Sequence, residues 1–172
     1  IGIYHDQKDY AVCFGVEPEI WQKAEDNQYV PETSLTETEI RMPGGHLTIA
    51  QLIALLNTIP MEITFVDVDN INRFFNEGPK DFKRPGMAID REVFSCHPPK
   101  IEATVRRIIG EFRAGALDEV PIWMDKNGKC MLVRYMAVRD KEGKYLGTLE
   151  LVQDMGFAKE HFQPEKRQEE IW

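Results

Sequence analysis

The hydrophobic pattern of the chain changes character near residue 45. Up to that point the apolar residues follow no sustained period, and residues 25–39 are mostly polar. A short strand at 10–16 and a short helix after Pro18 are the elements that this part suggests. Pro43-Gly44-Gly45 then breaks the pattern, because proline and glycine disfavour regular structure. We therefore expect residues 1–45 to be an N-terminal lead-in or linker.

Two amphipathic helices are predicted beyond this break. The first starts at Thr48, because Gln51 three residues later completes a capping-box pattern, and it ends at Pro60. Its apolar face is formed by Ile49, Leu52, Ile53 and Leu56. The second begins after Pro99 and ends at Gly115, a glycine position typical of helix C-termini. Its apolar stripe, expected to face a core, consists of Ile101, Val105, Ile108 and Phe112.

The strands follow from alternating apolar residues and from turn residues. Met61–Asp67 and Ile71–Phe75 are predicted to form a hairpin. The last third is predicted to be a meander of three long strands: Glu119–Met124, Cys130–Arg139 and Tyr145–Met155. A short helical turn within 86–96 and a C-terminal helix or linker at 157–172 complete the order. The predicted fold class is α+β, a five-stranded antiparallel sheet with helices on one face.

Composition and charge narrow the functions. The net charge of -8 disfavours nucleic acid or an anionic membrane as a partner, and no apolar run approaches the ~20 residues of a membrane span. Three widely spaced cysteines without a Cys-x-x-Cys motif fit a reduced, cytoplasmic compartment. The common motifs of phosphate-binding loops, serine nucleophiles and zinc hydrolases do not occur, so we expect no enzyme. The chain opens mid-pattern at Ile1, and we expect it to be a fragment of a longer protein.

Several uncommon strings occur in the order found in one PAS subfamily, which the chain resembles from Leu47 to Met155. The strings are Leu56-Asn57-Thr58-Ile59-Pro60, Ile63-Thr64-Phe65-Val66-Asp67, Cys96-His97-Pro98-Pro99-Lys100, Val133-Arg134-Tyr135, Ala137-Val138-Arg139-Asp140 and Tyr145-Leu146-Gly147-Thr148-Leu149-Glu150 with Gln153-Asp154. The subfamily is found at the C-terminal end of bacterial proteins, behind a domain of unknown function and a hemerythrin-like domain. Residues 1–45 resemble the linker that follows the hemerythrin-like part.

The chain departs from the subfamily pattern at two places. At the position of Pro121, members of the subfamily have a strand that runs from an acidic residue to an aromatic residue. A proline in this strand suggests that the strand lies at an edge of the sheet. Cys130-Met131 stands where members carry an aromatic residue, so the lining of the pocket differs from theirs.

The resemblance implies a PAS domain at 46–156 with a sensory role. Such a domain would bind a small ligand or cofactor between the sheet and the helices and transmit a conformational change, here as a cytoplasmic homodimer. Haem and flavin are the cofactor candidates, and the ligand is unidentified. The alternative is a ligand-free PAS module that serves dimerisation or protein interaction.

His97 is the first candidate for the ligand site. The proline that follows it holds His97 in an extended conformation at a corner before a helix. Its imidazole suits haem ligation, another metal or a hydrogen bond to a ligand acid group; the alternative is a brace for the helix after Pro99. Cys96 beside it is a candidate second ligand or redox thiol, or a buried inert thiol.

Arg134 and Tyr135 are the next candidates. Arg134 falls on the same side of its strand as Leu132 and Met136, and it needs an acid partner or an anionic ligand. An ion pair with Glu150 or Asp154 is favoured over the ligand. Tyr135 points to the opposite face. The predicted ligand-binding set is completed by Phe65, Ile108 and Phe112. Asp67-Val68-Asp69-Asn70 lacks the glycine and distal glutamate of a calcium loop, and is interpreted as a turn.

Overall fold

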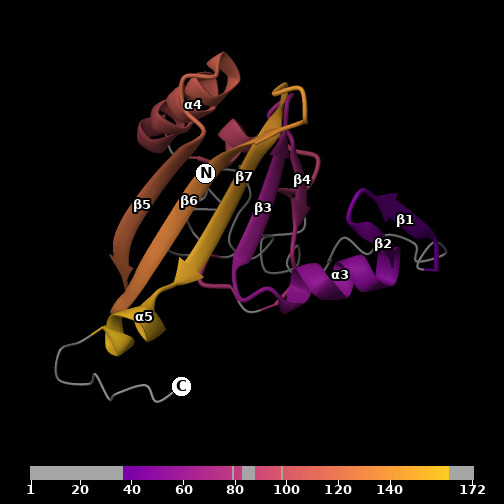
Figure 1. Ribbon diagram of the computed structural model, residues 1–172. Coiled ribbons are helices and arrows are strands. Elements are labelled where there is room, and N and C mark those ends of the chain that lie inside the picture. The colour runs from indigo at the N-terminus through magenta and orange to yellow at the C-terminus, as the bar shows by residue number, and fades with distance from the viewer. Residues whose placement is uncertain (1–36, 79, 83–87, 98, 163–172) are drawn as a thin grey trace, which may run out of the picture.

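The computed structural model describes residues 37–78, 80–82, 88–97 and 99–162 (Figure 1). The strand expected at 10–16 and the helix expected after Pro18 lie outside these residues, as does the end of the C-terminal helix beyond residue 162. Among the helices in the described ranges, none is long and apolar enough to cross a membrane.

The centre of the fold is an antiparallel five-stranded sheet, which confirms the predicted α+β class. Its order is β4-β3-β7-β6-β5. The strands are β3 (Glu62–Asp67), β4 (Asn72–Phe75), β5 (Glu119–Lys126), β6 (Lys129–Arg139) and β7 (Tyr145–Asp154). The chain therefore places β3 beside β7 in the middle of the sheet. Pro121 lies in β5 at the sheet edge, where its missing N–H costs no ladder hydrogen bond.

One face of the sheet, the inner face, is closed by helices. η2 (Val93–Cys96) and α4 (Pro99–Ala114) precede β5. The predicted stripe of α4 enters the core at Val105, Ile108 and Phe112, and Gly115 ends the helix with a left-handed φ of 74°. The strands supply the facing side chains of this core: Val66, Met131, Val133, Tyr135 and Val152.

The helix α3 (Ile49–Thr58) packs differently from α4. Its capping box between Thr48 and Gln51 is present as predicted, and it ends at Ile59 just before Pro60. However, none of its residues is buried. Figure 1 shows α3 running away from the foot of β3 rather than lying on the sheet. The predicted apolar face therefore exists along the helix, but it does not enter the core.

A small hairpin precedes α3. β1 (Glu39–Met42) pairs with β2 (Gly45–Thr48). The turn between them is Pro43-Gly44, within the expected break, and Gly45 is already the first residue of β2. The backbone N–H of Ile49 donates to the carbonyl of Thr38, which ties the hairpin to the helix. After the last strand of the sheet, α5 (Gly156–His161) follows β7.

Candidate functional site

Three polar side chains form a row across the middle of the inner face. Thr64 of β3 lies directly opposite Glu150 of β7, and Glu150 lies directly opposite Tyr135 of β6. Opposite residues of an antiparallel pair point to the same face, with Cβ atoms about 5 Å apart. All three are buried, and Glu150 is only 1% exposed. A hydroxyl, a carboxylate and a phenol thus stand side by side in the core; we call them the polar row.

A pair of hydroxyl groups lies beside the polar row, two residues before Glu150 on β7. Thr148 is fully buried, and its Oγ1 lies 2.8 Å from the hydroxyl of Tyr145. Ile108 and Phe112 of α4 belong to the same core cluster as Tyr135 and Tyr145. The interior therefore combines apolar helix side chains with hydrogen-bonding groups on the two central strands and on β6.

His97 occupies the corner that the sequence predicts. Its backbone is extended, with φ -123° and ψ 138°, and its side chain is buried. Nδ1 lies 2.7 Å from the carbonyl oxygen of Val93. Because a carbonyl can only accept, Nδ1 carries the proton, and in the neutral ring Nε2 carries the lone pair. The same hydrogen bond holds the imidazole ring against the start of η2.

Not all of the predicted site residues lie on the inner face. Tyr135, Ile108 and Phe112 are core residues, whereas Phe65 and Arg134 alternate to the opposite face, which we call the outer face. Cys96 ends η2, and its side chain lies outside the described part of the structure. The seven residues therefore do not form one site, because the period of two along a strand separates neighbours such as Arg134 and Tyr135.

The prediction that Arg134 pairs with Glu150 or Asp154 was wrong. Its Nε donates to Oε1 of Glu119 on β5 at 2.6 Å, instead of reaching Glu150 or Asp154. Glu150 cannot be the partner because it points to the inner face. The hydrogen bond from Arg134 lowers the pKa of the Glu119 carboxyl, against a smaller effect of burial.

Thr64, Thr148 and Glu150 were missed as site residues. Along Thr148-Leu149-Glu150-Leu151, alternation alone places the leucines inside and the polar residues outside. The structure has the reverse, since Thr148 and Glu150 are buried and both leucines are only half-buried. Val152, a core residue, is in phase with Glu150, so both phases of β7 contain apolar residues and the sequence pattern does not decide between the two faces.

A second buried carboxylate holds the segment that crosses one end of the inner face. Oε1 of Glu62 accepts from the backbone N–H of Asp81 at 2.5 Å and of Phe82 at 3.1 Å. Nζ of Lys126 donates to the carbonyl of Asp81 and lies 3.5 Å from the centre of the Phe82 ring. Lys129 adds an ion pair to Asp81 at 2.6 Å. Residues 81–82 are thereby fixed to β3, β5 and β6.

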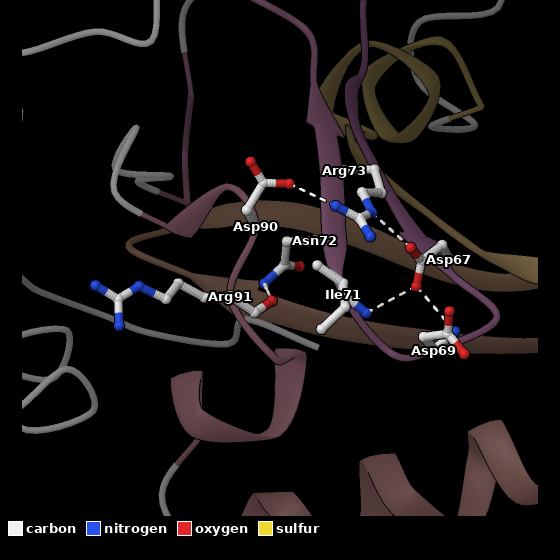
Figure 2. Close-up of polar contacts among 7 residues, drawn as sticks. All are labelled: Asp67, Asp69, Ile71, Asn72, Arg73, Asp90 and Arg91. Carbon is white, nitrogen blue, oxygen red and sulfur yellow. Dashed lines mark hydrogen bonds and ion pairs between the residues drawn. The ribbon is translucent and has the colours of Figure 1, made fainter.

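A charged network surrounds the turn between β3 and β4 (Figure 2). Oδ1 of Asp67 accepts from the N–H groups of Asp69 and Ile71, which confirms the predicted turn chemistry. Oδ2 pairs with Nε of Arg73 at 2.5 Å, and Arg73 reaches on to Asp90 at 2.6 Å. This network ties the turn to the segment that leads into η2 and His97.

The network also reaches α4. One Nη of Arg113 donates to the carbonyl of Val68 at 2.8 Å and to Oδ1 of Asn70 at 2.9 Å. Arg139 of β6 donates to the carbonyl of Phe112 at 2.7 Å, near the C-terminal end of α4. The last turns of α4 are therefore attached to the turn between β3 and β4 and to β6.

The network sets the ionisation of two of its members. Burial acts to raise the pKa of Asp67, but the hydrogen bonds from Ile71, Arg73 and Asp69 outweigh it, and the pKa lies below its ordinary 3.8. The hydrogen bonds to Asp67 and Asp90 raise the pKa of Arg73. Both groups are therefore charged at neutral pH.

The described residues contain no group of three or more His, Cys, Asp or Glu side chains that could hold a metal ion. The described interior presents hydrogen-bonding groups set among apolar side chains.

The fold and the sequence together define the class of protein. The chain matches the PAS domain family over residues 52–156, and it belongs to that family. The crystal structure of a C-terminal domain from Streptococcus mutans is similar, with a TM-score of 0.69 and 37% identity over 72% of this chain and 98% of that chain. Among curated proteins, no sequence match is found.

Two further structures align with lower scores. A sensory box sensor histidine kinase from Vibrio cholerae aligns with a TM-score of 0.42 and 12% identity, over 62% of this chain and 90% of that chain. VqmA from Vibrio cholerae, in a complex with ligand and DNA, aligns with a TM-score of 0.46 and 22% identity, over 64% of this chain and 52% of that chain.

Proposed function

We propose that this PAS domain is a sensory domain that binds a small organic molecule between α4 and the inner face of the sheet. The observation that carries the proposal is the polar row of Thr64, Glu150 and Tyr135. Removing a hydroxyl or a carboxyl group from water has a free-energy cost that an apolar side chain at the same position does not have. A core that served packing alone would be expected to carry apolar residues at the centre of its central strands.

The polar row also suggests what the ligand contributes. A carboxylate between two hydroxyl groups favours hydrogen-bond donors, so the ligand class that we propose has N–H or O–H groups at one end and an apolar body toward Ile108 and Phe112. In this proposal His97 either contacts the ligand or acts as a brace for η2 through its hydrogen bond to Val93. In this proposal, occupancy changes the position of α4, whose last turns are tied to the turn network.

Native mass spectrometry of the purified 172-residue chain tests the binding. We expect an excess mass that disappears on denaturation. Glu150→Gln keeps the shape of the side chain and should remove or sharply reduce this mass. Glu119→Gln makes the same chemical change on the outer face and should retain it. A bare protein mass in the wild type, or equal retention by the two variants, would contradict the proposal and favour the ligand-free interaction module.

A second variant separates the two roles of His97. If His97 contacts the ligand, His97→Ala should lose the excess mass while the melting temperature of the protein without ligand stays unchanged. If His97 is a brace, the same variant should melt several degrees lower and retain the ligand. Thermal unfolding of the same samples by circular dichroism distinguishes these results.

A further inference from the structure

Charged side chains gather at one end of the inner face, where four strands begin or end. β3 begins at Glu62, β5 ends at Lys126, β6 begins at Lys129 and β7 ends at Asp154. Because neighbouring strands of the sheet are antiparallel, these residues lie at the same end of it. Glu62 and Lys126 are each only 7% exposed. Charged side chains are rarely buried to this extent unless they are paired, and their partners here include residues 80–82, which we call the strap.

The backbone of the strap is held by charged side chains. The N–H groups of Asp81 and Phe82 both donate to Oε1 of Glu62, and the carbonyl of Asp81 accepts from Nζ of Lys126. The carboxylate of Asp81 adds an ion pair with Lys129 at 2.6 Å. Hydrogen bonds to charged groups are stronger than those between neutral groups. The side chains of Glu62 and Lys126 therefore form a firm clamp on the strap.

The segment that leads into η2 is attached to the sheet in a different way. It bonds backbone to backbone with residues 70–72: Asn72 exchanges hydrogen bonds with Asp90 and Arg91, each at 2.9 Å, and the Val93 N–H donates to the Asn70 carbonyl at 2.8 Å. The side-chain amide of Asn72 also donates to the Arg91 carbonyl (Figure 2). This segment extends the pairing of the sheet, whereas the strap is held by side chains that reach it from the strand ends.

The two attachments differ in what they leave behind on release. Glu62 and Lys126 carry full charges, and water hydrates a carboxylate or an ammonium group strongly. If the strap moves away, water replaces its backbone groups as partners of the clamp. The remaining cost is exposure of the Phe82 ring, which is 1% exposed and belongs to the core cluster. The strap can therefore open as a small unit while the sheet stays intact.

Phe82 occupies the interior at this end of the sheet. Its ring belongs to the same core cluster as Met131 and Val152, and Nζ of Lys126 lies 3.5 Å from the ring centre. We propose that the strap opens reversibly, under the control of the Glu62–Lys126 clamp, and is the entrance through which the small molecule reaches the inner face. The inference rests on the proposed function for what passes through the entrance. The opening itself is a property of the protein without ligand.

Amide hydrogen exchange, followed by NMR on the 172-residue chain, tests the opening. The N–H groups of Asp81 and Phe82 should share one protection factor. Their protection should be at least about tenfold lower than that of Asp90 and Val93, because a segment that opens alone exchanges ahead of one that is paired with the sheet. Equal or higher protection of the strap would overturn the proposal.

Substitutions in the clamp test its control of the strap. Lys126→Met keeps an unbranched side chain and removes the charge, and Glu62→Gln keeps an acceptor oxygen and removes the charge. Each should speed exchange in the strap by about tenfold, the loss expected for a hydrogen bond to a charged group, and leave exchange at Asp90 and Val93 unchanged. Lys144→Met makes the first change at an exposed position and should have no effect. Clamp variants that match this control would overturn the proposal.

Thiol labelling tests whether the opening leads into the interior. Val152 lies directly opposite Glu62, and Val66 lies further along β3 toward the other end of the inner face; both are buried. With iodoacetamide as the probe, Val152→Cys should react about tenfold faster when it is combined with Lys126→Met, and Val66→Cys should not. Peptide mapping separates these positions from the native cysteines. Equal acceleration at both positions, or none at position 152, would overturn the entrance.

These results are independent of the native mass spectrometry that tests ligand binding. A strap that opens in a protein without an excess mass would contradict the proposed function alone. An excess mass in a protein whose strap stays closed would contradict the entrance alone. Circular dichroism of each variant confirms that it is folded.

Discussion

The two long helices of this domain, α3 and α4, contrast in a way that composition alone does not explain. Seven of the ten residues of α3 are aliphatic and none is charged, yet none of its residues is buried. α4 carries charged residues along its length, yet Val105, Ile108, Ile109 and Phe112 are all core residues. The less apolar helix is therefore the buried one.

The difference lies in how polar residues are distributed and in what the chain brings opposite each helix. α4 has charged residues on one side and an apolar stripe on the other, which defines a single orientation over a sheet. Its C-terminal end leads into β5, and Arg139 of β6 donates to the carbonyl of Phe112 in its last turn. α3 has no charged face, and its attachment at Asn57 and Asn76 directs it outward. The number of apolar side chains on a helix shows how much surface needs to be covered. The fold of the chain decides whether another element lies opposite that surface.

The largest expected effect is a difference in the free energy of unfolding between a substitution in α4 and one in α3. Phe112→Ala removes a completely buried ring and should lower the free energy of unfolding by about 3–5 kcal/mol. Leu55→Ala should change it by less than about 0.5 kcal/mol, because the side chain is half exposed. Urea unfolding at low protein concentration, where association does not contribute, measures both. Equal losses would show that α3 is part of the core.

A pair of glycines sharpens the contrast between the sheet and α4. A Cβ at Gly147 of β7 would lie 2.3 Å from the carbonyl oxygen of Val66 and 2.8 Å from the Phe65 ring. Gly147→Ala should therefore destabilise the protein by about 1–3 kcal/mol. Gly110 of α4 has open space around its Cβ position, so Gly110→Ala should stabilise by about 0.5–1 kcal/mol. Thermal unfolding should give shifts of opposite sign; shifts of the same sign would contradict this.

The smallest expected effect concerns the turn network that ties α4 to β3. The pKa of Asp67 is lowered in the folded protein from its ordinary 3.8. A group with a depressed folded pKa contributes stability that is fully present above the ordinary pKa and is lost as the pH falls through the folded pKa. Asp67→Asn should therefore be about 1 kcal/mol less stable than the wild type at neutral pH.

The two stability curves should approach each other as the pH is lowered through and below 3.8. Urea unfolding over this pH range measures the difference. A difference that does not change with pH would show that the carboxylate charge of Asp67 has no part in the network.

The candidate site shows where alternation of apolar and polar residues along a strand predicts the buried face and where it does not. In β6, Tyr135 and Arg134 were assigned to opposite faces, and the structure confirms this. In β7, both phases contain apolar residues, so the pattern at Leu149 and Leu151 does not identify the inner face. The sequence favours Glu150 or Asp154 as the partner of Arg134, whereas the structure makes Glu150 a core residue. The choice depends on register with β3 and β6, which brings Thr64, Glu150 and Tyr135 into one row.

The sequence by itself determined the elements whose signals are local. These are the capping box at Thr48, the turn at Asp67, the end of α4 at Gly115 and the five strands in their order, together with the PAS resemblance over most of the chain. Caps, turns and periodicity depend on residues a few positions apart, so one sequence suffices to read them. Tertiary structure alone decided that α3 projects outward, that Arg134 pairs with Glu119, and that Glu150 is buried. Each of these depends on which distant segments meet, and strand register and helix coverage set that choice.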